Sequence, residues 1–223
     1  MEKNISIWDS IYKNNTFVNI DQFPSKQLQA FVLHHIKTSN IKNPMLLEIG
    51  CGIGISTKYL SDFVSFIEAI DASETCISKA RKINSKNCNF HVADYRDLSF
   101  LEDNYFDFIS SEAVIYYGDK TSFIKGVNEI YKKLKIGGIA RIYTKSNNDT
   151  YSKNSGKPIN LEQDTYMIID PKKYEFGLTV YMPDLNSIKG IFSNFKDIKI
   201  GIEEFNHIDL DIIHSYWIIT CTK

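Results

Sequence analysis

The hydrophobic pattern between residues 44 and 144 alternates between short apolar runs and longer segments with helical spacing. Strands that alternate with helices of this length form right-handed βαβ units in a mostly parallel sheet. This part of the chain therefore predicts a doubly wound α/β domain. The predicted strands are the apolar runs at residues 45–50, 66–71, 89–95, 105–111 and 139–144.

The predicted helices carry start and stop signals. Ser73 has the side chain of an N-cap residue, for a helix that runs to about Lys86. Residues 121–135 have apolar positions near 3.6-residue spacing and lysines at their C-terminal end, and the glycine pair at residues 137–138 is expected to stop this helix. A shorter helix is predicted over residues 56–63.

The pattern changes after the fifth predicted strand. Residues 145–183 are polar and rich in Asn, Lys and Tyr, which indicates an insertion. We expect it to hold a small antiparallel hairpin of residues 166–170 and 177–182. The elements predicted to follow are a helix over residues 184–195 and two closing strands over residues 197–205 and 212–221.

The composition argues against two classes of protein. The 223 residues are 43% hydrophobic and 24% charged, which are the proportions of a globular protein rather than a disordered one. Lys and Arg number 26 against 27 Asp and Glu, so the net charge of −1 provides no basic field for a polyanion. We therefore expect no nucleic-acid partner.

The sequence pattern also lacks targeting and metal-binding signals. The first residues have no apolar core of a signal peptide, and no stretch approaches the length of about 18 apolar residues that a membrane helix needs, so no membrane partner is expected. The 4 cysteines lie far apart, with no Cys/His spacing that favours zinc. The sequence predicts a cytoplasmic, reduced protein without a metal site.

The segment LLEIGCGIGIS at residues 46–56 joins a buried strand to the next helix through three glycines. Gly50, Gly52 and Gly54 lack Cβ atoms, so a ligand can lie against their backbone amides and the following helix N-terminus. In an open parallel sheet, ligands bind at the carboxyl ends of the strands, where this loop is expected. A glycine-rich turn alone does not identify the ligand, because dinucleotide-binding enzymes also use one.

The spacing within this loop argues against two common nucleotide sites. A dinucleotide fingerprint requires glycine at the position of Ile55, and a P-loop requires a lysine after Gly54. Glu48, two residues before the first glycine, would repel a phosphate but suits a cationic ligand or its amino group. The loop therefore favours a ligand that carries positive charge.

Two further carboxylates end the next two predicted strands. Asp71 ends the second strand, at the place where an acid commonly binds both hydroxyls of a ribose. Asp94 ends the third strand and precedes Tyr95, so its oxygens can accept from an exocyclic amine while the aromatic ring covers a base. Carboxylates at three successive strand ends indicate one shared ligand site.

The chain contains, in this order, the segments LLEIGCGIGIS, IEAIDAS, HVADYRDL, YFDFISSEAVIYYG and LKIGGIARIY. Their order and spacing resemble the signature blocks of class I S-adenosylmethionine-dependent methyltransferases. The resemblance covers about residues 44–144 and, more weakly, the two closing strands. It implies a Rossmann-like, doubly wound α/β fold whose seven-stranded sheet is mostly parallel, with an antiparallel last strand and helices on both faces.

The resemblance implies S-adenosylmethionine as the cofactor. Glu48 and the backbone of the glycine loop would hold its amino acid part, and Asp71 would take both ribose hydroxyls. Asp94 would bond the adenine amino group, with Ala72 and Tyr95 beside the ring. The cofactor-binding residues implied in this way are Glu48, Gly50, Cys51, Gly52, Gly54, Asp71, Ala72, Asp94, Tyr95 and Ser111.

Residues after the fourth strand bear on catalysis. Ser111 and Glu112 would border the methionyl group, in a block that looks like that of small-molecule methyltransferases of the broad type 11 and type 25 groups. Glu112 and Tyr116 stand four apart and would share a face if helical, either as catalytic groups or as a structural pair. His207, near the last turn, is a third catalytic candidate as a general base.

The N-terminal segment and the insertion bear on the acceptor. Trp8 and Tyr12 belong to an amphipathic stretch that resembles the N-terminal helix covering the cofactor in small-molecule members. Tyr181 and four other tyrosines of the insertion region could bind an aromatic or cationic acceptor, or only fill a loop-rich cap. The four others are Tyr143, Tyr151, Tyr166 and Tyr174.

The sequence thus predicts an S-adenosylmethionine-dependent methyltransferase that acts on an O or N atom of a small molecule, as a monomer or a homodimer. An RNA or protein methyltransferase remains an alternative, as does a non-catalytic cofactor-binding partner subunit. The expected organisation is an N-terminal helical lid (1–43), a cofactor-binding core (44–144), an acceptor cap (145–183) and a closing helix with two strands (184–223).

Overall fold

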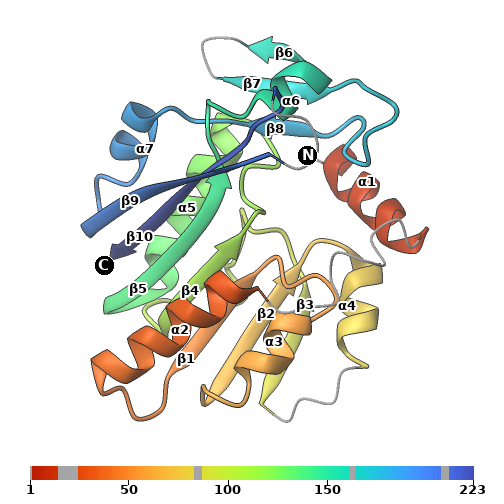
Figure 1. Cartoon of the computed structure of the whole chain (residues 1–223). Coiled ribbons are helices and arrows are strands. Elements are labelled where there is room, and N and C mark those ends of the chain that lie inside the picture. The colour runs from red at the N-terminus through yellow and green to blue at the C-terminus, as the bar shows by residue number, and fades with distance from the viewer. Residues whose placement is uncertain (1, 15–24, 83–86, 161–163, 207–210) are drawn as a thin grey trace.

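The computed structural model describes residues 2–14, 25–82, 87–160, 164–206 and 211–223. Seven strands form one sheet in the order β3-β2-β1-β4-β5-β10-β9 (Figure 1). All neighbouring pairs from β3 to β5 are parallel, whereas β10 runs antiparallel to both β5 and β9. The predicted mostly parallel sheet with an antiparallel last strand is confirmed. The strands are β1 (Met45–Ile49), β2 (Phe66–Asp71), β3 (Cys88–Val92), β4 (Phe106–Glu112), β5 (Leu134–Lys145), β9 (Lys196–Phe205) and β10 (His214–Thr222).

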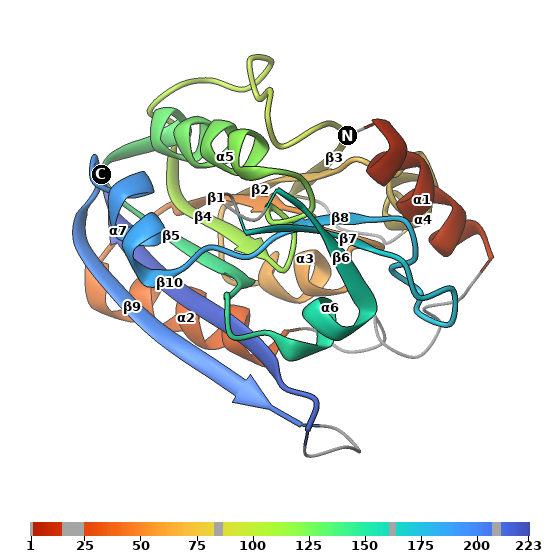
Figure 2. The same cartoon turned by 90° about the horizontal axis from the view of Figure 1, so that it is seen from above.

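Helices cover both faces of this sheet because its central strands are apolar on both sides (Figure 2). On β1, Leu46 packs in one cluster with Leu28, whereas its neighbour Leu47 packs in the opposite cluster with Val127. No helix within the described ranges has the length and apolar composition to cross a membrane. One face carries α2 (Lys26–Ser39), α3 (Ile55–Leu60) and α4 (Glu74–Ala80), and the other carries α5 (Lys120–Lys133) and α7 (Leu185–Ile191).

The insertion forms a second, small sheet over the carboxyl ends of the parallel strands (Figure 1). The predicted hairpin is confirmed, since Tyr166 of β7 pairs antiparallel with Val180 of β8. A third strand, β6, and a short helix, α6, were not predicted from the sequence. Beside this sheet lies the N-terminal helix, α1. The bounds are α1 (Glu2–Lys13), α6 (Thr150–Ser155), β6 (Gly156–Asn160), β7 (Thr165–Ile168) and β8 (Thr179–Tyr181).

The predicted role of the glycine pair at residues 137–138 is wrong. The helix α5 ends at Lys133, and Leu134 already has extended backbone and pairs with Phe106. The pairing then shifts, so that the glycines lie inside β5 at an irregularity where a Cβ on Gly138 would come 2.9 Å from the Phe106 carbonyl oxygen. The glycines therefore serve the sheet rather than the helix terminus.

The helix after β2 begins as predicted but ends early. The Ser73 hydroxyl accepts a hydrogen bond from the Cys76 N–H, which confirms it as the N-cap of α4. This helix ends at Ala80 rather than near residue 86, which itself lies outside the described residues.

Candidate functional site

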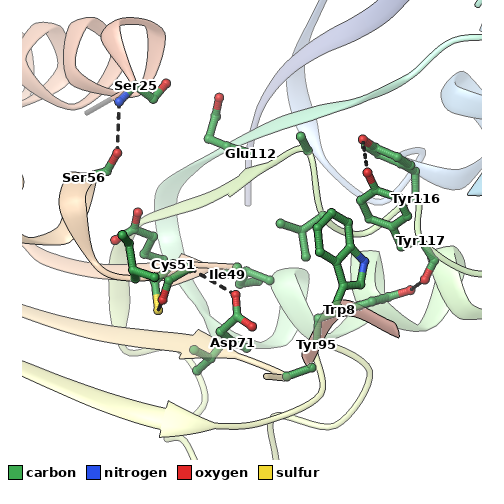
Figure 3. A pocket seen from close by; sticks show the side chains of 18 of the residues that line it. Trp8, Ser25, Ile49, Cys51, Ser56, Asp71, Tyr95, Glu112, Tyr116 and Tyr117 are labelled. Atoms are coloured by element: carbon green, nitrogen blue, oxygen red, sulfur yellow. Dashed lines mark hydrogen bonds between the residues drawn. The ribbon is translucent and has the colours of Figure 1, made fainter. Parts of the chain in front are cut away.

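A cavity of about 520 Å³ lies at the carboxyl ends of the central strands, beneath α1 and the insertion (Figure 3). Its volume is within the range of small-molecule sites, about 300–1,000 Å³. Eight of the ten predicted cofactor-binding residues line this cavity, namely Glu48, Gly50, Cys51, Gly52, Asp71, Ala72, Asp94 and Tyr95. Ser111 and Gly54, the N-cap residue of α3, do not line it.

The glycine loop folds back onto the end of β2. The N–H groups of Gly50 and Cys51 donate to the Ile70 carbonyl oxygen at 2.7 and 2.9 Å. Gly50 has a φ of +80°, and a Cβ there would lie 2.0 Å from Val114 Cγ2, so only glycine fits. The loop backbone consequently forms one wall of the cavity.

Asp71 supports this loop from β2. One carboxylate oxygen accepts from the Gly52 N–H at 3.0 Å (Figure 3). The other accepts from the Ser73 N–H at 2.8 Å. A carboxylate has two acceptor oxygens, which suit the two hydroxyls of a diol. Asp71 also lines the cavity, so it lies at the position predicted for the ribose.

Glu48 lies behind the loop as a buried carboxylate with 5% exposure. Its Oε2 accepts from the Thr57 hydroxyl at 2.6 Å. Burial raises the pKa of Glu48 to about 7, and the nearby carboxylates of Glu112 and Asp71 act in the same direction. A cation in the cavity would favour the ionised form of this group.

Asp94 is already paired in this structure. The Arg96 guanidinium binds both of its carboxylate oxygens, and the Arg96 N–H donates to Oδ1 at 3.0 Å. Burial alone would raise the pKa of Asp94, but these bonds hold it below its usual value. Tyr95 also lines the cavity, while its ring packs against Gly126 and into the core.

The end of β4 differs from the prediction in two ways. Glu112 and Tyr116 do not share a helix face, because Glu112 is the last strand residue and the residues after it form a turn, with Ala113 at a φ of +58°. Ser111 is fully buried in the sheet and is not part of the cavity lining. Glu112 does line the cavity, and it is held by an ion pair with the buried Arg141 of β5. Burial raises the pKa of Glu112 against the effect of that arginine.

A buried chain of hydroxyl groups follows this turn. The Tyr116 hydroxyl donates to the Tyr117 hydroxyl at 3.1 Å, which donates to Glu175 Oε1 at 2.7 Å. Figure 3 shows Trp8 beside the two tyrosines, and its ring meets that of Tyr117 edge-on with centroids 4.9 Å apart. Sequence reasoning missed Tyr117 and Glu175. The adjacent tyrosines gave a weak signal for the first, and nothing in the pattern marked the second.

The helix α1 covers the cavity and is attached on both sides. At its start, the Asn4 side chain exchanges two 3.0 Å hydrogen bonds with the Thr179 backbone of β8. Further along, Asp9 accepts from the Ser73 hydroxyl and the Thr75 N–H, each at 2.9 Å. Burial alone would raise the pKa of Asp9, but these bonds lower it. This attachment places Trp8 and Tyr12 in the cavity wall.

Several predicted acceptor contacts lie elsewhere. Tyr181 is buried in the core, edge-on to Phe123, and is not part of the cavity lining. Of the insertion tyrosines, Tyr174 alone lines the cavity. His207 lies outside the described residues.

The comparisons with known proteins converge on one kind of domain. A family model described as a methyltransferase domain matches residues 47–142. A phosphoethanolamine N-methyltransferase of Triticum aestivum is 35% identical over 96 residues, which are 42% of this chain and 19% of that protein. A malonyl-[acyl-carrier protein] O-methyltransferase of Bacillus cereus is 30% identical over 136 residues, 56% of this chain and 48% of that protein. The chain spans half or less of the length of the curated relatives that it matches.

Solved structures agree with these matches at the level of the fold. The N-methyltransferase NodS of Bradyrhizobium japonicum, in complex with S-adenosylhomocysteine, has a TM-score of 0.67 at 16% identity, with 99% of this chain and 98% of that chain covered. A SAM-dependent methyltransferase of Methanosarcina mazei has a TM-score of 0.65 at 21% identity, with 82% and 93% covered.

Proposed function

We propose that this chain, which matches a methyltransferase domain model over residues 47–142 and has the fold of solved methyltransferases, is a class I enzyme that transfers a methyl group from S-adenosylmethionine to an O or N atom of a small molecule. The observation that carries the proposal is the glycine loop held by Asp71 with the buried Glu48 behind it. All three elements belong to one cavity of suitable size.

S-adenosylmethionine is the cofactor that these cavity groups fit. The glycine loop presents backbone amides and the strands beside it present carboxylates. These groups suit a ligand with an ammonium group, a sulfonium and a ribose diol. We assign Glu48 and the glycine-loop backbone to the amino acid part of the cofactor and Asp71 to the ribose hydroxyls. Asp94 and Ala72 then lie on the adenine side, where Asp94 shares its oxygens with Arg96.

The cofactor supplies a methyl group that is already activated by the positive sulfur. The protein must therefore orient the acceptor and exclude water more than it must activate the methyl group. We assign these tasks to Glu112 and Tyr116 at the end of β4 and to Trp8 and Tyr12 of α1, all of which line the cavity. In this proposal residues 1–43 act as the lid and residues 145–183 as the acceptor cap.

Direct binding measurements test the proposal. We expect calorimetry to show binding of S-adenosylmethionine and S-adenosylhomocysteine but not of NAD. Asp71→Ala should weaken binding of both by about 2 to 4 kcal/mol, because it removes two charge-assisted hydrogen bonds to a buried ligand.

Asp107→Ala is the matched control for this variant. Asp107 also accepts from a backbone N–H, that of Met45, but it lies at the opposite end of the strands. Binding of NAD without binding of the two sulfur compounds would disprove the proposal, and equal affinities of the two variants would show that the ribose lies elsewhere.

The proposed setting of this enzyme is the cytoplasm, as a monomer or a homodimer without a nucleic-acid partner. The balanced charge of the chain supports the last point, because a methyltransferase of nucleic acid would need a basic face to hold its substrate.

A further inference from the structure

We propose that the acceptor is a small molecule with a protonated amine, and that Tyr117 and Glu175 take up the proton that this amine must lose before its nitrogen can attack. The inference rests on the proposed methyl transfer and narrows it to one acceptor class. It draws on the charge of the cavity wall, the aromatic rings opposite the glycine loop and the hydroxyl chain behind them.

The charged groups of the cavity wall are all of one sign. Within the described part of the chain, the charged side chains that line the cavity are Glu48, Asp71, Asp94 and Glu112, and no Lys, Arg or His is among them. The guanidinium that pairs with Glu112 belongs to Arg141, which lies behind the wall with 4% exposure. An acceptor with a carboxylate or phosphate would be desolvated here without a cation, which is costly. The wall therefore favours a neutral or positively charged acceptor.

Aromatic rings gather on the side of the cavity that faces the end of β4. Trp8 of α1 lies 4.9 Å from Tyr117 and 6.4 Å from Tyr174, measured between ring centroids. The three residues come from three separate segments, and all line the cavity. A cation is attracted to the face of such rings within about 6 Å of the centroid. Rings combined with the Glu112 carboxylate favour a positively charged amine over a neutral acceptor.

An ammonium nitrogen has no free electron pair, so a proton must leave it before methylation. Tyr117 lies in the cavity wall, and its hydroxyl donates to Glu175 Oε1 at 2.7 Å. Glu175 has 2% exposure and does not line the cavity, so a proton reaches it through Tyr117. Burial raises the pKa of Glu175, although Lys145 acts against this, which makes the carboxylate a stronger base.

The surroundings of Glu175 leave it able to receive that proton. Lys145 of β5 is already paired with Asp149 at 2.7 Å, both buried. Besides Lys145 and Asp149, the titratable groups that interact electrostatically with Glu175 are tyrosines. Burial raises the pKa of each of these tyrosines, so their hydroxyls stay neutral around neutral pH. The tyrosines are Tyr116, Tyr117, Tyr151, Tyr174 and Tyr216.

Two linked proton transfers free the electron pair of the nitrogen. An N–H proton of the ammonium passes to the Tyr117 oxygen while the Tyr117 hydroxyl proton passes to Glu175, which becomes neutral. The freed nitrogen pair then forms the bond to the methyl carbon, and the sulfur keeps the electrons of the bond that breaks. The positive charge thereby moves from sulfur to the methylated nitrogen, beside Trp8 and Tyr174.

The acceptor class is tested with a mixed library of amines, alcohols, phenols and carboxylic acids. The library is incubated with the full chain and S-adenosylmethionine that carries a deuterated methyl group, and the products are identified by mass spectrometry. Label on amines alone is expected. Label chiefly on hydroxyl or carboxylate compounds, or label on no amine, overturns the inference.

A calorimetric titration with S-adenosylmethionine on the same sample tests the proposed function separately from the acceptor class. Without cofactor binding the proposed function itself fails. With binding but no labelled amine, only the acceptor class fails.

The proton path is tested on the best labelled amine with Glu175→Gln and Tyr117→Phe. Each should lower kcat about 100-fold near neutral pH with little change in KM, since general base catalysis contributes factors of this size. The loss should shrink as pH rises, because more of the amine is then free of its extra proton.

Glu129→Gln and Tyr131→Phe are the matched controls, since Glu129 is buried but lies with Tyr131 on α5, and neither lines the cavity. Both should keep the wild-type pH profile. A loss in Glu175→Gln that is equal at every pH would show a purely structural role and overturn the path.

Discussion

Glu48 places a carboxylate inside an apolar strand, where an ionised group is costly. The sequence showed it as an exception to the apolar pattern, and its place beside the glycine loop made it a ligand candidate. Asp71 was predictable because it is the last residue of β2, whose position follows from the strand pattern. Neither the Arg96 contact of Asp94 nor the burial of Ser111 was predictable, since each depends on which way a side chain turns at its strand end.

The raised pKa of Glu48 predicts a stability that depends on pH. The pKa of Glu48 in the folded state, about 7, exceeds the ordinary value of 4.5. The contribution of Glu48 to the free energy of unfolding is therefore complete below about pH 4.5 and is lost as pH rises through 7. Relative to Glu48→Gln, the ligand-free wild type should lose up to about 3 kcal/mol of unfolding free energy between pH 4.5 and 8. Urea denaturation of both proteins across this range measures the difference.

The same substitution should act in the opposite direction on binding. Glu48→Gln removes the negative charge that we assign to the amino group of the cofactor, so it should weaken S-adenosylmethionine binding most at pH 8. Parallel stability curves for the two proteins would contradict the buried, raised pKa of this residue.

At the scale of elements, the strands followed from their continuous apolar runs, because the sheet is buried on both faces. Most helices followed from the 3.6-residue spacing of their apolar positions. The glycine pair of β5 was misread, because the same residue that ends helices also fits an irregular strand, and the partner strand decides between them. The contact of Glu175 with Tyr117 could not be predicted from the sequence, because the two residues are 58 positions apart. One lies in the β7–β8 loop and the other in the turn after β4.

The attachment of α1 to α4 through Asp9 predicts a helix that loosens when this carboxylate is removed. Asp9→Ala leaves the Thr75 N–H and the Ser73 hydroxyl without this acceptor, which should cost about 1 kcal/mol. Amide hydrogen exchange of residues 2–13 should become faster, and the cofactor should dissociate several-fold faster. Asp184→Ala, which removes the N-cap of α7, is the control and should leave α1 unchanged. Unchanged exchange in α1 of Asp9→Ala would contradict the role of this contact.

At the scale of the whole molecule, the cavity joins three parts that are separate in sequence: α1, the strand ends and the insertion. A ligand that binds the folded state at 100 times its dissociation constant adds about 2.7 kcal/mol to the unfolding free energy. For a chain of this size we expect S-adenosylmethionine to raise the melting temperature by roughly 5 to 10 °C. Differential scanning calorimetry measures the shift, which should be small in Asp71→Ala at the same concentration and should not occur with NAD.

The double attachment of α1 also has a consequence for the pace of the reaction. We expect product that forms under this helix to leave after the Asn4 or the Asp9 contacts open. The slow step of each cycle is then expected to be an opening motion rather than bond exchange, so a burst of one product per enzyme molecule should precede the steady rate.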